Sequence, residues 1–136
     1  MTQKDKPQSQ IVPILAAALV CDVACVDPNS GKHTLIGIFD VIHVRNFPSR
    51  RHISVYLKIT NAEGTYEFDV RFVQVATNKI LVGAKGNFEV KSRVIPMGLY
   101  IPFPPFDIPS DGRYEFQVWA NTIYLGSTCI DVEKSA

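Results

Sequence analysis

A strict alternation of apolar and polar residues constrains the fold of this chain most. In residues 53–60, ISVYLKIT, four aliphatic side chains alternate with serine, tyrosine, lysine and threonine. A period of two residues is typical of a β-strand with one buried face. The same alternation recurs at 66–72, and its phase changes at Phe72–Val73. That change predicts a β-bulge or a bend in the second strand.

Turn sequences separate further strand-like segments, and no amphipathic helix of useful length is visible. NAEG at 61–64 and ATNK at 76–79 are dense in residues that form tight turns between antiparallel strands. About seven to eight short strands without helices are typical of an antiparallel β-sandwich. We therefore expect an all-β, single antiparallel β-sandwich. A barrel is the second possibility, and the choice between an immunoglobulin-like and a jelly-roll topology stays open.

The length of 136 residues predicts one domain, because most domains have about 100–150 residues. We expect a flexible arm at residues 1–10, which are rich in Gln, Lys and Ser, and the β-sandwich at 11–133. Fourteen basic and thirteen acidic side chains leave a formal charge of +1. This balance provides no broad positive surface, so we expect neither a nucleic acid nor a membrane as a partner.

The apolar run at 11–26 resembles the middle of a signal peptide, but a proline and an aspartate interrupt it. Its uninterrupted part is far shorter than the roughly 20 residues that span a bilayer. Cys21 and Cys25 lie four residues apart in a predicted strand, so their Cα atoms would be about 13 Å apart and could not be bridged. With Cys129 they make an odd number of thiols. We expect free, buried thiols and a cytoplasmic protein.

The segment DPNSGKHTLIG at 27–37 resembles the end of a phosphate-binding loop. Val26 stands where that loop needs its first glycine, His33 stands where it needs a serine or threonine, and a strand follows instead of a helix. The segment also resembles the start of an EF-hand, but Ile38 occupies the position of the bidentate glutamate. We therefore interpret it as a hairpin turn whose Lys32 and His33 face water.

The sequence contains no recognisable pattern of an enzyme or of a metal site. Its cysteines and histidines show no C-x-x-C pair and no zinc-type spacing, while calcium at an end loop, through Asp107 and Asp111, stays open. Folding could bring Asp22, Asp40 and His43 together, but no nucleophile signature supports them. We expect no enzymatic activity, no metal and no cofactor.

One basic cluster surrounds Phe47 and Pro48 and consists of Arg45, Arg50, Arg51 and His52. A protein that binds single-stranded nucleic acid combines basic residues with several stacking aromatic rings, and only Phe47 is close in sequence. We interpret this cluster as part of a turn-rich, solvated loop.

The segment 92–112 contains five of the nine prolines. Because proline removes a hydrogen bond from a β-ladder, we expect this segment to cross between sheets or to run along a sheet edge. Its aromatic residues lie in a stiff chain, and a tryptophan follows on the polar face of a later strand. The predicted interaction surface is Tyr100, Phe103, Phe106 and Trp119. Alternatively, the aromatic residues of the loop close the end of the sandwich and cover Trp119.

The stretch CDVACVDPNSGKHTLIGIFDVIHVRNFP at 21–48, together with HISVYLKIT and GRYEFQVWANTIYLG, resembles a family of short bacterial proteins known as a domain of unknown function. These segments span most of residues 20–126. The resemblance implies a cytoplasmic β-sandwich, and it assigns no catalytic or binding residues.

These patterns favour a protein-interaction or self-assembly module, because the exposed edge strands of a sandwich are a common route to association. Its partner would be another protein or a second copy of the chain, in a homo-oligomer. The alternative is a small-ligand binder, for example for carbohydrate, that uses Trp119 and the aromatic loop. An enzyme is the third hypothesis.

Overall fold

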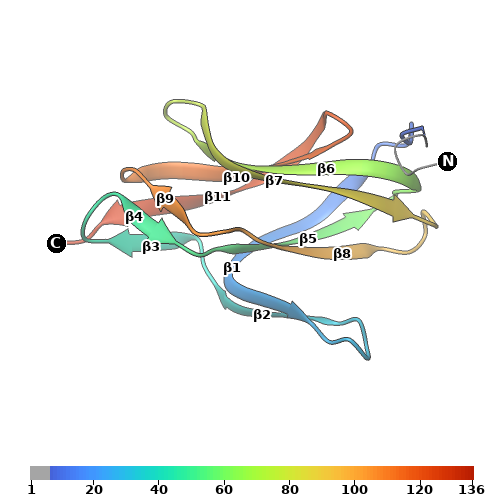
Figure 1. Ribbon diagram of the computed structural model, residues 1–136, viewed down its shortest axis with the longest axis horizontal. Coiled ribbons are helices and arrows are strands. Elements are labelled where there is room, and N and C mark those ends of the chain that lie inside the picture. The colour runs from blue at the N-terminus through green and yellow to red at the C-terminus, as the bar shows by residue number, and fades with distance from the viewer. Residues whose placement is uncertain (1–6) are drawn as a thin grey trace.

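The computed structural model describes residues 7–136, which form two stacked β-sheets (Figure 1). One sheet has the strand order β2-β1-β5-β8, the other has the order β3-β11-β10-β6-β7, and β4 pairs with β9 in a small two-stranded sheet. The strands are β1 (Ile14–Val26), β2 (His33–Ile38), β3 (Val41–Val44), β4 (Ser49–Arg51), β5 (Ser54–Thr60), β6 (Gly64–Gln74), β7 (Lys79–Val90), β8 (Met97–Pro102), β9 (Phe106–Ile108), β10 (Gly112–Ala120) and β11 (Ile123–Lys134). No sheet of the described residues closes into a barrel, so the predicted all-β sandwich is confirmed and the barrel alternative is wrong.

The described residues form eleven strands rather than seven or eight, because segments interpreted as loops contain short strands. β4, which holds part of the basic cluster, pairs with β9 of the proline-rich segment. β8 of the same segment pairs with β5 at the edge of the four-stranded sheet, as predicted. One pair departs from the predicted antiparallel pattern, since β3 runs parallel to the end of β11.

The alternation in the sequence becomes the two faces of each sheet. In β5, Val55, Leu57 and Ile59 are fully buried between the sheets, whereas Tyr56 and Lys58 lie on the outer face. β10 repeats this pattern with a buried aromatic and aliphatic face. The change of phase in the sequence at Phe72–Val73 coincides with a shift of register between β6 and β7, which confirms the predicted irregularity.

Aromatic rings fill the core near β9 and β10. The ring of Phe72 stacks parallel to that of Tyr114 with centroids 5.1 Å apart, and it also contacts Phe106 at 4.9 Å and Phe116 at 4.7 Å. Phe103 packs against Phe116 at 5.4 Å. The aromatic residues of the proline-rich segment therefore complete the core, because short offset or tilted contacts between rings add to the burial of their area.

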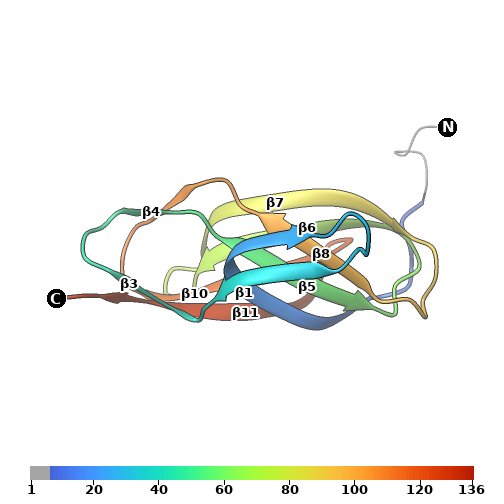
Figure 2. The same ribbon diagram turned by 90° about the horizontal axis from the view of Figure 1, so that it is seen from below.

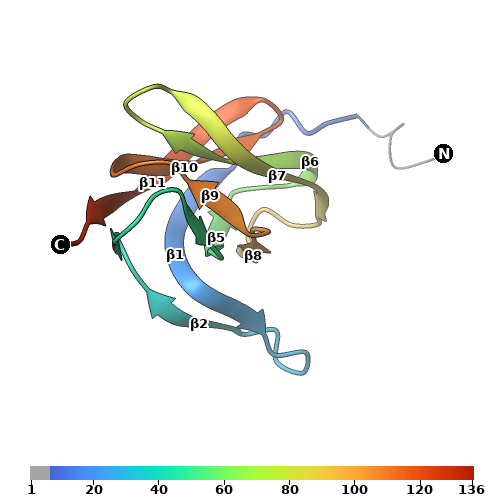
Figure 3. The same cartoon turned by 60° about the vertical axis from the view of Figure 1, so that its left-hand side comes forward.

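β1 belongs to two strand pairs in succession. Residues 14–21 pair with β5, and residues 21–26 pair with β2. The second half of β1 thus bends away from β5 and carries β2 with it as a hairpin, which lies beyond the outer face of β5 and β8 (Figures 2 and 3). The backbone N–H of Gly31 donates to the carbonyl oxygen of Asp27 at 2.8 Å, so the turn predicted at 27–32 is confirmed.

The segment before β1 is attached to the sandwich. The Ser9 backbone N–H donates to the Thr65 carbonyl oxygen at 3.0 Å, and the Tyr66 hydroxyl lies 2.8 Å from the carbonyl oxygen of Ile11. Ser9, within the predicted flexible arm, and Ile11, just after it, are therefore both hydrogen-bonded to β6. Residues 1–6 of the arm lie outside the described residues.

Residues 14–26 of the apolar run at 11–26 form strand β1. Within residues 7–136, no helix is long and apolar enough to cross a membrane.

Candidate functional site

The predicted interaction surface of four aromatic residues does not exist as one surface. Phe103 and Phe106 are 0% and 8% exposed, respectively, and belong to the core. Tyr100 lies opposite Tyr56 on the outer face of the four-stranded sheet, whereas Trp119 lies on the outer face of the five-stranded sheet. The prediction was wrong for Phe103 and Phe106, because proline-rich loops can fold back onto the core and sequence spacing does not show which side of a loop is covered.

Trp119 is half-buried and its ring is already in contact with neighbouring side chains. The Arg71 guanidinium lies 4.6 Å from the ring centroid, in a cation–π contact, and the Asp69 carboxylate lies 2.8 Å from that guanidinium. Tyr124 meets the indole edge-on at 5.2 Å. Arg71 therefore occupies a face of the indole that a sugar ring would need. Arg71 and Tyr124, which contact the Trp119 ring, come from β6 and β11, not from the proline-rich segment.

An exposed apolar surface lies on the β1–β2 hairpin instead. Across this strand pair Val23 is opposite Ile36. Val23 is 51% exposed, and Ile36 and Ile38 are each 57% exposed. The side chains of Val23, Cys25, Ile36 and Ile38 share one side of the hairpin, which we call the hairpin face. The hairpin face contains no charged residue, and the exposure of its apolar area to water is unfavourable in the isolated chain.

The hairpin face adjoins the least protected of the four edges of the two larger sheets. β2 contains no proline and no Lys, Arg, Asp or Glu, and its outer backbone edge has no partner strand in the described chain. By contrast, the edge strand β7 carries Lys79 and Lys85, β8 ends at Pro102, and β3 has only four residues. Charged residues, prolines and shortness are the usual protection against pairing with another chain, and β2 lacks the first two.

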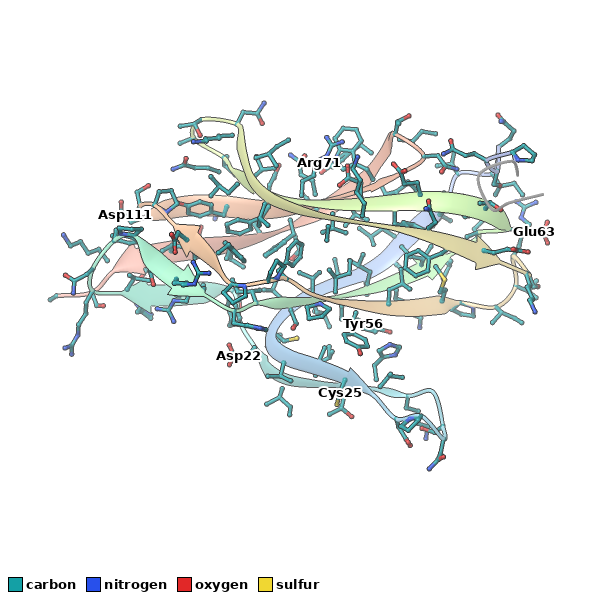
Figure 4. The ribbon with its side chains drawn as sticks, in the orientation of Figure 1. Asp22, Cys25, Tyr56, Glu63, Arg71 and Asp111 are labelled. Atoms are coloured by element: carbon teal, nitrogen blue, oxygen red, sulfur yellow. The ribbon has the colours of Figure 1, made fainter. Side chains whose placement is uncertain are left out.

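The opposite side of the hairpin is tied to the sandwich. His33, which was predicted to face water, is half-buried, and its ring meets those of Tyr56 at 5.1 Å and Tyr100 at 5.9 Å. Figure 4 shows Tyr56 on the side of β5 that faces the hairpin. An open groove of about 660 Å³ continues from this contact along Lys32, Lys58 and Gly98. The aromatic contact holds the hairpin in a defined position, so the hairpin face is presented outward.

A second candidate site is a cavity of about 470 Å³ at the point where β1 bends away from β5. It is lined by Asp22, Phe39, Val41, Ile42, His43, Arg50, Arg51, His52 and Ile53, and we call it the Arg51 cavity. Of the three residues considered as a catalytic set, Asp22 and His43 line this cavity and Asp40 does not. Three members of the predicted basic cluster line the cavity and Arg45 does not, so this cluster is part of a cavity wall as well as a loop.

The basic side chains of the Arg51 cavity differ in their partners. Arg50 lies 3.5 Å from the carboxylate of Asp107, and the His43 ring lies 3.6 Å from that of Glu133. The Arg51 Nε donates to the Ser49 hydroxyl at 3.1 Å, and its Nη2 donates to the His43 carbonyl oxygen at 3.4 Å. Both acceptors of Arg51 are neutral. Among residues 7–136 no carboxylate pairs with the Arg51 guanidinium.

The three cysteines are free thiols, as predicted, but they are not all buried. Cys21 is buried, whereas Cys25 and Cys129 are exposed. Burial raises the pKa of the Cys21 thiol, and the nearby Asp22 charge adds to that rise. The described part of the chain contains no cluster of three or more His, Cys, Asp or Glu side chains that could hold a metal ion.

Sequence reasoning missed the hairpin face and the Arg51 cavity as sites. A continuous apolar run such as LIGI is typical of a strand buried on both sides, so the sequence contains no signal that Ile36 and Ile38 are exposed. The cavity draws on residues 22, 39–43 and 50–53. Their convergence depends on the way β1, β3 and β4 meet, which no local pattern shows.

Comparison with known proteins agrees with the resemblance seen in the sequence. A search of the curated proteins gives no match to the chain. A family model matches residues 16–133, from near the start of β1 almost to the end of β11, and so covers most of the sandwich. The chain therefore belongs to a family of unknown function, DUF6941.

Proposed function

We propose that this protein is a non-enzymatic self-assembly module, in which two copies associate through the hairpin face and the free edge of β2. The observation that carries the proposal is the coincidence of both features on one hairpin: Val23, Ile36 and Ile38 are more than half exposed, and the adjoining strand edge is unprotected. Burial of apolar area and formation of a β-ladder would both favour association there.

A second copy fits this surface better than a charged partner. The hairpin face is uncharged, so two copies meet without like-charge repulsion and a charged peptide gains no ion pair. In a twofold interface the same patch of both copies takes part, so the patch must be complementary to itself, and an uncharged apolar patch meets this requirement. Antiparallel pairing of β2 with β2 of the second copy would join the two four-stranded sheets into one.

The location we propose is the cytoplasm. Cys25 and Cys129 are exposed and unpaired, which fits a reducing compartment where such thiols persist. No catalytic step is required for the proposed role.

The first test is the mass in solution, measured by light scattering over a wide range of concentrations. The chain has a mass of 15.2 kDa, and we expect the measured mass to approach twice that value as concentration rises. Ile36→Lys places a charge at the centre of the hairpin face and should return the protein to the mass of one chain. Ile80→Lys is the matched control, because Ile80 is 52% exposed on β7 and lies outside the hairpin face.

The second test uses the cysteines as internal reporters. Cys25 belongs to the hairpin face, whereas Cys129 lies on β11 of the other sheet. The alkylation rate of Cys25 should fall as protein concentration rises, while that of Cys129 stays constant. A single chain mass at every concentration, with equal behaviour of the two thiols, would refute the proposal.

A further inference from the structure

The Arg51 cavity has the size and lining of a small-molecule site. Its volume of about 470 Å³ lies within the range of roughly 300–1,000 Å³ that ligand pockets occupy. Phe39, Val41, Ile42 and Ile53 supply an apolar wall, and the polar groups stand beside it. Ligand pockets commonly combine an apolar lining with a few placed polar groups.

Of the two arginines that line this cavity, Arg51 is the one without an ion pair to residues 7–136. Two hydrogen bonds to neutral acceptors, Ser49 and the His43 carbonyl, hold its guanidinium in place. They use Nε and one Nη2 hydrogen, so Nη1 and the second Nη2 hydrogen remain without a described acceptor. A guanidinium stays charged at every accessible pH, and a carboxylate or phosphate binds it with paired, charge-assisted hydrogen bonds.

The neighbouring basic side chains of Arg50 and His43 contribute less, because each already has a protein carboxylate beside it. Asp107 stands beside Arg50 and Glu133 stands beside His43. His52 lines the same cavity and makes no hydrogen bond or ion pair within residues 7–136. Asp22 is the one carboxylate in the lining, and it forms no ion pair with a described residue. The unbalanced charge of Arg51 therefore faces an open space with an apolar wall.

We propose that the Arg51 cavity binds a small organic anion, whose carboxylate or phosphate group contacts the Arg51 guanidinium and whose apolar part rests on Phe39, Ile42 and Ile53. This site is separate from the hairpin face, because none of the hairpin-face residues lines the cavity. Failure of self-association and failure of anion binding are therefore distinguishable.

The test is a titration of the full chain with four probes of similar shape, followed by two-dimensional NMR of backbone amides and arginine Nε–H groups. The probes are benzoate, phenyl phosphate, benzylamine and benzyl alcohol, at constant ionic strength. Benzoate or phenyl phosphate should produce saturable shifts at Ile42, Ile53 and the Arg51 Nε–H. The anion that binds more tightly identifies a carboxylic acid or a phosphate ester as the ligand class. Benzylamine and benzyl alcohol should bind at least tenfold more weakly.

Two substitutions with opposite expected effects make the test independent of folding defects. Arg51→Gln should weaken binding of the anionic probes at least tenfold, since it removes the charge that holds them. Asp22→Asn should strengthen binding a few-fold, since it removes the repulsive carboxylate, and a damaged fold would not produce a gain. Arg93→Gln is the control with the same loss of charge, because Arg93 bonds to Asn61 and does not line the cavity.

The proposal also predicts that Ile36→Lys leaves the affinity for benzoate or phenyl phosphate unchanged. Equal binding of benzylamine and benzoate, unaltered affinity in Arg51→Gln, or the absence of any saturable shift would each overturn it.

Discussion

Gly37 of β2 lies beside the carboxylate of Asp22 on β1, and its backbone has a φ of +72°. A Cβ atom at this position would meet the Asp22 carboxyl group, and a side chain would also be strained by the left-handed backbone. We expect Gly37→Ala to lower the free energy of unfolding by about 1–3 kcal/mol. The denaturant midpoint in urea measures this change.

Gly31 is the matched control for Gly37→Ala. It has the same φ of +72°, but no atom lies within 4 Å of the position of its Cβ. Gly31→Ala therefore carries the backbone strain without the contact with Asp22. We expect it to destabilise less than Gly37→Ala and to leave the amide shifts around the Arg51 cavity unchanged. Equal effects of the two substitutions would show that the contact with Asp22 contributes nothing.

The Tyr114 hydroxyl is the buried polar group whose loss is easiest to isolate. Tyr114 is fully buried, and its hydroxyl donates to the Ser110 carbonyl oxygen at 2.7 Å, which fixes the turn between β9 and β10. Tyr114→Phe keeps the stacked ring but leaves that carbonyl without its partner, so we expect a loss of about 1–3 kcal/mol in the free energy of unfolding. Tyr124→Phe, at an exposed position, should change the stability by less than about 0.5 kcal/mol. Urea unfolding of both variants makes the comparison.

The strands that form the middle of each sheet could be predicted from the sequence, because they have one buried and one outer face. In β5 and β10 this asymmetry produces a period of two, and the pattern alone predicts which residues form the core. The turn at Asp27 could be predicted because its residue types favour a turn locally, whatever the hairpin packs against.

The sites could not be predicted in the same way, because they depend on which surfaces other elements cover. Phe103 and Ile36 are both apolar residues in apolar surroundings, yet the first is fully buried and the second is 57% exposed. Their difference arises because the loop before β9 folds onto the core, while β1 bends away from β5 and takes β2 with it. Arg51 meets Asp22 around one cavity for the same reason, since β4 and β1 meet only in the folded chain.

Asp27 connects the stability of the hairpin turn to pH. The Ser30 hydroxyl donates to the Asp27 carboxylate at 2.7 Å, and the Asn29 backbone N–H donates to it at 3.0 Å. These bonds favour the ionised form and lower the pKa of Asp27, the Ser30 bond most. A lowered pKa means that the stabilisation is present above the ordinary aspartate pKa and is lost as pH falls through the lowered value.

Ser30→Ala tests this dependence directly. We expect the pKa of Asp27, followed through its own carboxyl carbon signal in an NMR titration, to rise toward the ordinary value. Lys32→Ala in the same turn is the control, because the Lys32 side chain makes no hydrogen bond with the Asp27 carboxylate. An unchanged pKa in Ser30→Ala would show that the hydroxyl does not hold the carboxylate in solution.

Thiol labelling should separate the three cysteines in the native protein. Cys21 is fully buried, and its Sγ lies 3.6 Å from the Ser54 carbonyl oxygen, where β1 passes from β5 to β2. Burial first and the Asp22 charge second raise the pKa of its thiol, so the reactive thiolate is scarce near neutral pH. At low protein concentration, we expect iodoacetamide to modify Cys25 and Cys129 at least about tenfold faster than Cys21. Mass spectrometry of the digested protein gives the three rates.

Denaturation and Asp22→Asn distinguish the two causes of this protection. In guanidinium chloride the three cysteines should react at similar rates, because burial is lost. In native Asp22→Asn the Cys21 thiol should remain slow, since the substitution removes the smaller cause and leaves burial intact. Fast labelling of Cys21 in the native wild type would instead show that the second half of β1 separates from β5, and with it that the hairpin moves away from the sandwich.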